Sequence, residues 1–300
     1  MDDLNVTEEN CKTAEELFDL LSPVSIHSKA MNGKQFVFRG QSCCQQLLVP
    51  TSYRARDRLA STEAQSEFER KVLCELYEAS NKSGLAIPNY DTVLPFLGRI
   101  SGAWPPVELH RMIAFAQHHG VPTRFLDWTY MPYVAIYFAA SGVISTITDS
   151  LSRLEDGVAR ETVLSCLKNK KLAIWQLELS NCLEHSSLKR HSEVVVVRTH
   201  AASSVNLAPQ GGVFTLTPTY SVESEKGRPD FLHALSDMGQ LSCVTKYTVP
   251  YTQALALVQM CGAVGINEAT LFPGVDGVVR KTMQQLDISK VEAFFQYAKD

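Results

Sequence analysis

The run PYVAIYFAA at 132–140 is apolar nearly all round and constrains the fold more than any other part of the chain. Proline fits only the first turn of a helix, so Pro132 predicts a helix that begins near 129–131. A helix with apolar residues on every side is buried between layers and does not lie on a surface. The sequence therefore predicts that the short segment before this helix lies near the middle of the domain.

That preceding segment, QHHGVPTRFLDWT at 117–129, carries more polar side chains than an ordinary core connection needs. Apolar residues recur at helical spacing over 107–119, and Gly120 is placed to end that helix in a left-handed conformation. Residues 123–128 then predict a short strand that leads into the apolar helix. We expect the floor of any functional site in this segment.

Strands and helices do not alternate strictly along the chain, which favours an α+β fold over a doubly wound parallel sheet. The expected architecture is a mixed or antiparallel central sheet flanked by helices. We predict strands at 35–39, 173–179, 194–198, 213–217 and 243–249, and helices from 13, from 62, over 252–262 and in the tail. Residues 1–34 are assigned to an N-terminal helical extension, and 35–300 to one domain with a helical insert at about 141–172.

Side-chain spacing also predicts which faces are buried. Along the strand at 35–39, Phe36 and Phe38 share one face and Arg39 points to the other. Alternation over 173–179 indicates a half-buried strand. In the helix from 62, the charged residues are expected on a solvated face. These residues are Glu67, Glu69, Arg70 and Lys71.

The composition excludes some classes of function. A formal net charge of −4 gives no basic footprint for non-specific nucleic-acid binding. The N-terminus lacks a signal peptide's basic and apolar regions, and no run reaches the roughly 18 apolar residues of a membrane span. The eight cysteines form no CxxC pair and read as reduced. We therefore expect a cytoplasmic protein without nucleic-acid or membrane partners.

Five short motifs follow one another over roughly 35–280. They are FRGQ at 38–41, QHHGVPTRFLDWT at 117–129, AIYFA at 135–139, QGGVFT at 210–215 and LFPGVDG at 271–277. Together they resemble the FRG domain family, which is named for the Phe-Arg-Gly tripeptide. The family is chiefly bacterial and phage-associated, so the resemblance implies a bacterial protein that serves as a toxin or phage-defence effector.

A second resemblance, to ADP-ribosyltransferase folds, concerns the order of Arg39-Gly40, then Thr129, then the aromatic pair before Ala139, then a later acid. It implies a split sheet, NAD or a related nucleotide as substrate, and transferase or NAD glycohydrolase activity, with a protein as a further partner. The arginine would pair with phosphate or ribose oxygens, and the glycine would let the backbone approach the dinucleotide. The threonine would orient the nicotinamide ribose, and a carboxylate would stabilise the oxocarbenium-like centre.

The sequence departs from this second pattern at its last position. Gln210 stands where the catalytic glutamate is expected, and an amide cannot act as a carboxylate. Glu268 is the best substitute acid, and Glu178 is a further option. The predicted catalytic residues are Arg39, Thr129 and Glu268, and the predicted ligand-binding residues are Gly40, Gln41, His118, His119, Arg124, Asp127 and Gln210.

Each assignment has a structural alternative. Arg39 can pair with a buried carboxylate such as Asp127, and Arg124 can form an ion pair with the same aspartate. His119 falls on the apolar side of its helix and reads as a core residue, while the helix C-terminus favours protonation of both histidines. A metal site at His118, His119 and Asp127 is disfavoured, because adjacent helical residues point about 100° apart.

The sequence leaves two classes of function open. One is an enzyme that acts on NAD or a related nucleotide. The other is a ligand-sensing or protein-interaction module without chemistry, which the missing glutamate at Gln210 favours.

Overall fold

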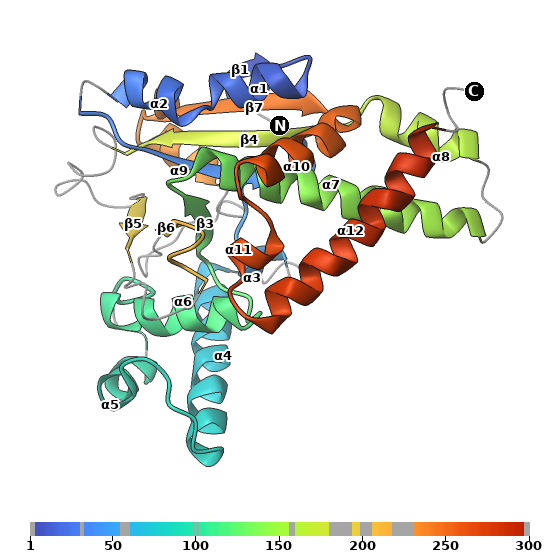
Figure 1. Cartoon of the computed structure of the whole chain (residues 1–300). Helices are drawn as coiled ribbons and strands as arrows, with labels where there is room; N and C mark the ends of the chain where they lie inside the picture. Colours follow the sequence, from blue (N-terminus) through green and yellow to red (C-terminus); the bar gives the residue numbers. More distant parts are fainter. Residues whose placement is uncertain are drawn as a thin grey trace.

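The computed structural model describes residues 4–30, 33–54, 61–98, 100, 102–155, 160–179, 194–198, 206–217 and 231–296. Within these residues, seven strands form one mixed sheet flanked by helices (Figure 1), which confirms the α+β expectation. A charged segment at 223–229, which the sequence predicts to be a loop, lies outside the described residues.

The strands are β1 (Thr7–Asn10), β2 (Phe36–Gln41), β3 (Leu126–Thr129), β4 (Lys171–Glu178), β5 (Val195–Val197), β6 (Gly212–Leu216) and β7 (Val244–Pro250). The first helices are α1 (Ala14–Leu20), α2 (Pro23–Ala30), α3 (Thr51–Arg54), α4 (Thr62–Lys82), α5 (Tyr90–Val93) and α6 (His110–His118). The later helices are α7 (Pro132–Glu155), α8 (Arg160–Lys168), α9 (Phe231–Asp237), α10 (Ala254–Ala263), α11 (Glu268–Leu271) and α12 (Val275–Gln296).

The strand order is β1-β7-β4-β2-β3-β6-β5, with β1 parallel to β7 and every other pair antiparallel. Most neighbouring strands pair along their length, as β2 does with β4 from Phe36 to Gln41. Between β2 and β3, however, the register consists of a single pair, Phe38 with Thr129. The sheet therefore separates into two halves at this junction.

Helix α7 is the buried helix expected from the apolar run. Val134, Ile136, Tyr137 and Ala139 are fully buried in a cluster that includes Phe38 of β2. Its 132–152 segment is long and apolar enough to cross a membrane, which corrects the expectation that no run reaches that length. Its burial against the sheet is that of a core helix.

Each half of the sheet has its own set of helices. Helices α1, α7, α10 and α12 share one core with β2, β4 and β7, while α4 and α6 pack with Phe125, Phe214 and Leu216 beside the β3-β6-β5 half (Figure 1). The predicted N-terminal extension contributes β1 to the sheet and Leu17 of α1 to the first core. The site described below lies where the two halves meet.

The structure confirms the predicted faces of β2 but differs from the prediction for β4. Phe36 and Phe38 share a buried face and Val37 lies in the opposite cluster, as alternation predicts. Strand β4 is buried on both faces, because α9 covers the side that was expected to be solvated. The helical segment after 140 is the second half of α7, followed by α8.

The cysteines differ in state. The free ones among the described residues are Cys11, Cys43, Cys44, Cys74 and Cys261. Cys243 is disulfide-bonded, so the expectation that all eight are reduced is wrong for this residue. A cytoplasmic location stays a prediction.

The glycine of the Phe-Arg-Gly tripeptide is required by packing. A Cβ at Gly40 would lie 2.0 Å from the carbonyl oxygen of Ala135, so only glycine lets β2 approach α7 this closely. We expect Gly40→Ala to destabilise the fold by about 3 kcal/mol or more, measured by chemical denaturation.

Gly262→Ala is the matched control for this substitution. Gly262 lies within α10 with nothing within 4 Å of its Cβ position, and alanine there should stabilise the fold by roughly 0.5–1 kcal/mol. Equal stability of the Gly40→Ala variant and the wild-type protein would contradict the packing argument.

Candidate functional site

A cavity of about 790 Å³ lies at the junction of the two halves of the sheet. Strands β2 and β3 contribute Arg39 and Asp127, and α6 contributes His118. Further lining comes from the 206–212 segment before β6 and from the α11–α12 region. The volume falls within the roughly 300–1,000 Å³ typical of small-molecule sites.

Six of the ten predicted site residues line this cavity. They are Arg39, Gly40, His118, Asp127, Thr129 and Gln210. The other four, Gln41, His119, Arg124 and Glu268, are not among the lining residues, and each has a contact described below that accounts for it.

Arg39 spans the junction between the two halves. Its Nη1 donates to the backbone carbonyl of Asp127 at 2.7 Å and lies 3.6 Å from the carboxylate of the same residue. The pairing foreseen as an alternative for Arg39 is therefore present, but the Asp127 side chain is 62% exposed. The Nε of Arg39 is buried without a hydrogen-bond partner in the described part of the chain. A ligand in the cavity could satisfy this donor.

The electrostatic environment of Arg39 combines burial with charges of both signs. Burial lowers the pKa of its guanidinium, the Asp127 carboxylate opposes that shift, and the positive charge of Arg54 adds to it. Arg54 lies in α3 and also lines the cavity, so two guanidinium groups act on the same space. Paired arginines favour an anionic ligand such as a phosphate.

A chain of hydrogen bonds fixes the carboxylate of Asp127. The Thr123 hydroxyl donates to Oε1 of Gln117, which orients the amide so that its Nε2 donates to Oδ1 of Asp127. The same hydroxyl accepts from the backbone N–H of Phe125 at 3.2 Å. Asp127 is therefore held from two sides, by Gln117 and by Arg39, and its carboxylate faces the cavity in a defined position.

Thr129 and Gln210 bind each other through one short contact. The Thr129 hydroxyl donates to the backbone carbonyl of Gln210 at 2.6 Å and accepts from the N–H of Met131 at 3.0 Å. The side-chain amide of Gln210 donates to the carbonyl of Leu271 at 3.1 Å. The hydroxyl proton of Thr129 is thus donated to the Gln210 carbonyl. One lone pair of the hydroxyl oxygen remains and can accept a hydrogen bond from a ligand hydroxyl.

The two histidines at the end of α6 differ from the prediction. His119 is exposed and packs its ring against Phe115, so its assignment to the core is wrong. His118 lines the cavity, and its pKa is lowered first by burial and then by the charge of His119. The lowered pKa of His118 runs against the expectation that the end of α6 favours its protonation.

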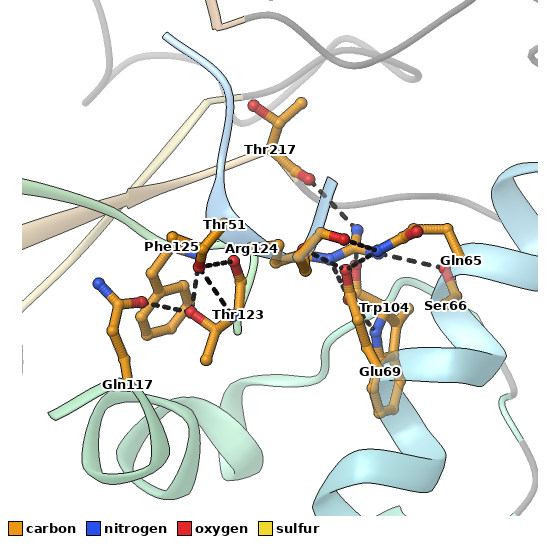
Figure 2. Close-up of polar contacts among 11 residues, drawn as sticks. Thr51, Gln65, Ser66, Glu69, Trp104, Gln117, Thr123, Arg124, Phe125 and Thr217 are labelled. Carbon is orange, nitrogen blue, oxygen red and sulfur yellow. Dashed lines mark hydrogen bonds and ion pairs between the residues drawn. The ribbon is translucent and has the colours of Figure 1, made fainter. Parts of the chain in front are cut away.

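Arg124 forms a buried ion pair that anchors the chain just before β3 (Figure 2). Its Nε lies 2.6 Å from the carboxylate of Glu69, and both side chains are almost inaccessible, at 2% and 7%. This partner corrects two expectations, the Arg124–Asp127 pair and the solvated position of Glu69. The charge of Glu69 and the hydrogen bonds outweigh burial and raise the pKa of Arg124.

Glu69 is the centre of a larger polar cluster (Figure 2). Its carboxylate also accepts hydrogen bonds from the Trp104 indole at 2.9 Å, the Ser52 hydroxyl at 2.8 Å and the Gln65 amide at 2.8 Å. Arg124 in turn donates to the carbonyl of Trp104 at 3.2 Å. The cluster joins α3, α4 and the chain entering β3, so Arg124 positions the floor of the cavity and does not face it.

Gln41 and Glu268 are also held inside the protein. Gln41 is buried and accepts a hydrogen bond from the Trp175 indole at 2.6 Å. Glu268 lies 3.2 Å from the Tyr137 hydroxyl, and the same hydroxyl donates to Gln284 at 2.8 Å. Burial raises the pKa of Glu268, against the opposing effects of Tyr137 and Arg280, and its Oε2 is buried without a partner in the described chain.

Glu268 is not among the residues that line the cavity, and its carboxylate is within hydrogen-bond distance of the Tyr137 hydroxyl. Tyr137 shares this hydroxyl between Glu268 and Gln284, and the Gln284 amide is oriented by donating to the Ser141 hydroxyl. Glu178, the further option, forms an ion pair with Lys34 at 2.9 Å and does not line the cavity.

Sequence reasoning missed four lining residues that complete the site. Arg54, Arg280, Phe138 and Phe272 line the cavity, and Arg280 lies 4.6 Å over the ring of Phe272. The motif AIYFA at 135–139 contained Phe138, but nothing in the sequence pairs it with a residue 134 positions later. Among the described residues, no three His, Cys, Asp or Glu side chains gather as a metal site would require.

Arg124→Met tests the anchoring role of the buried pair. The variant leaves Glu69 charged and buried, so we expect a loss of about 3–5 kcal/mol in the free energy of unfolding, measured by urea denaturation. Glu67→Gln, which breaks an exposed pair with Arg70, is the control and should cost less than about 1 kcal/mol. Similar small losses in both variants would refute the anchoring role.

The pH dependence of stability tests the raised pKa of Glu268. Because its folded pKa is raised, its favourable contribution is complete below the unfolded pKa and is lost as the pH rises through the folded pKa. Glu268→Gln should therefore melt close to wild type near about pH 4 and above it near about pH 8. Glu75→Gln, at an exposed position of α4, should show no such difference. Lower stability of Glu268→Gln near the higher pH would contradict this reading.

One comparison with known proteins gives a match. Residues 34–146 match the family model described as FRG domain, which confirms the resemblance over that part of the chain. No curated protein and no solved structure matches the chain. The matched segment contains Arg39, Gln117, Asp127 and Thr129, whereas the motifs at 210–215 and 271–277 lie beyond it.

Proposed function

From the FRG domain and its cavity, we propose that the protein binds NAD or a related nucleotide and is an ADP-ribosyltransferase-like enzyme. The observation that carries the proposal is the meeting of Arg39, Asp127 and Thr129 on neighbouring strands around one cavity. The charged side chains among the described lining residues are three arginines and one aspartate. This surplus of positive charge suits the two phosphates of a dinucleotide.

The lining offers separate contacts for the two chemical parts of such a ligand. Arg39, with its unpartnered Nε, and Arg54 supply donors for phosphate oxygens. Phe138 and Phe272 supply aromatic surface for a base, and their ring centroids lie 6.2 Å apart. The lone pair left on Thr129 can accept a hydrogen bond from a ribose hydroxyl.

In the proposed reaction, the bond between ribose C1′ and the nicotinamide nitrogen breaks, and its electron pair leaves with neutral nicotinamide. Asp127, the carboxylate that lines the described cavity, stabilises the positive charge that develops on the ribose. A water or a side chain of a protein target then forms the new bond to C1′ and releases a proton to solvent. Asp127 takes the role predicted for Glu268, which is not among the residues that line the cavity.

Labelled NAD tests the proposal with four proteins. Wild type should release nicotinamide, Asp127→Asn should bind NAD but turn it over roughly 10²–10³-fold more slowly, and Arg39→Ala should lose binding. Glu268→Gln is the matched acid-to-amide control and should keep wild-type turnover. If the wild-type protein neither binds nor consumes NAD or related nucleotides over a broad range of conditions, the proposal fails.

A second candidate function is ligand sensing without chemistry. Two observations favour it: Gln210 brings an amide to the cavity where the transferase pattern has a glutamate, and Glu268 is held away from it. Under this reading, calorimetry detects nucleotide binding that requires Arg39, and the bound nucleotide is recovered unchanged. Turnover that disappears in Asp127→Asn would exclude it.

A role as a toxin or phage-defence effector in the bacterial cytoplasm would follow from NAD consumption. Expression in bacteria should lower the cellular NAD content for wild type but not for Arg39→Ala. Unchanged NAD in both cultures would remove the basis for that role.

A further inference from the structure

Helix α12 carries apolar side chains on its outer face. Those side chains are Val275, Val278, Val279, Met283 and Leu286, each more than half exposed. At about 100° per residue they fall within an arc of roughly 140°, which we call the outer stripe. The opposite face of the helix, with Ile288, Val291 and Phe294, is buried in the core. The side chains of the outer stripe are therefore not the ones that pack α12 against the core of its own chain.

A stripe of this kind differs from scattered apolar residues. Single exposed apolar side chains are common on soluble proteins, whereas contiguous ones mark interaction surfaces. Figure 1 shows α12 running along the outside of the molecule, with α7 and α10 behind it. Its length of 22 residues is enough for a helix-to-helix contact with another molecule.

The charges beside the stripe indicate which partner fits. Asp276 lies just beyond the edge of the stripe and Lys290 lies inside it, both on the same side of its midline, at about 100° and 60° from Val275. We propose that two copies of this chain pair through α12 in antiparallel orientation, about a twofold axis at Met283. Residues whose numbers sum to about 566 then face each other, so Asp276 meets the partner's Lys290 and Leu286 meets the partner's Val279.

The symmetry of the pairing selects the antiparallel orientation. A twofold axis perpendicular to both helices keeps equivalent flanks on the same side, so the Asp276 contact with the partner's Lys290 occurs twice. A parallel arrangement in register, about an axis along the helices, would place equivalent flanks on opposite sides of the interface, so Asp276 would not meet the partner's Lys290. Within the described chain, neither residue has an ion pair of its own.

The size of the outer stripe determines how tightly the two copies are expected to bind each other. A standard stable interface buries roughly 800 Å² on each partner, and five side chains on one helix bury less. The dimer should therefore have a dissociation constant on the order of micromolar. The inference is independent of the proposed function, because it uses no residue that was assigned a role in turnover.

Charge exchange on the full chain tests the register. Sedimentation over a range of protein concentrations should show a dimer for wild type, at least about tenfold weaker association for Asp276→Lys and for Lys290→Asp, and recovery in the double variant. Both positions are exposed, and melting curves establish that each variant is folded. Failure of the double variant to recover would overturn the proposed pairing.

Cross-linking tests the position of the twofold axis. Met283→Cys should form an intermolecular disulfide well above the wild-type level, because the two cysteines meet at the axis. Ser289→Cys is the control, because its two copies would lie roughly 18 Å apart along the helices. A monomer at every concentration, capture of α12 by lipid vesicles, or equal cross-linking of both variants would overturn the proposal.

Discussion

The buried ion pair between Arg124 and Glu69 determines where the cavity floor lies. Taking both charges out of water is costly, so the pair persists only because the indole of Trp104 and the side chains around it satisfy the remaining atoms. The pair fixes the chain immediately before β3 to α4, which packs beside the β3-β6-β5 half of the sheet. Because Arg124 is held in place, Thr123 and Asp127, which lie on either side of it in the sequence, also have defined positions.

The cavity depends on this anchor and on a second constraint at β2. Gly40 allows α7 to pack directly on the backbone of β2, so the half of the sheet that holds Arg39 is fixed by one helix. The other half, which holds Asp127, is fixed by α4 and α6. Arg39 bridges them through the carbonyl of Asp127, and the single β2–β3 register pair leaves space beside that bridge. The site is a product of two separately packed cores.

Sequence patterns predicted the parts of this arrangement that depend on local spacing. The buried helix after Pro132, the faces of Phe36 and Phe38, and the helix end at Gly120, whose φ is 83°, follow from periodicity and backbone preference. Six of the ten residues predicted for a site line the same cavity, and three of them come from the segment at 117–129 that forms its floor.

The predictions that differ from the structure concern contacts between residues far apart in the sequence. Glu69 sits among charged neighbours on a helix, and nothing near it reveals a partner 55 positions later. Glu268 occupies a plausible position in the motif order, but its carboxylate contacts Tyr137 and the residue does not line the cavity. His119 follows the apolar spacing of its helix, yet α6 ends there and the side chain emerges into solvent. Periodicity describes one element at a time and carries no information on these pairs.

The FRG domain match ends within α7, and this boundary divides the cavity wall by origin. Arg39, Asp127 and Thr129 come from the matched segment, whereas Gln210, Phe272 and Arg280 come from chain beyond it. The charged floor of the cavity therefore lies within the matched segment, whereas the aromatic ring of Phe272 and the guanidinium of Arg280 lie outside it.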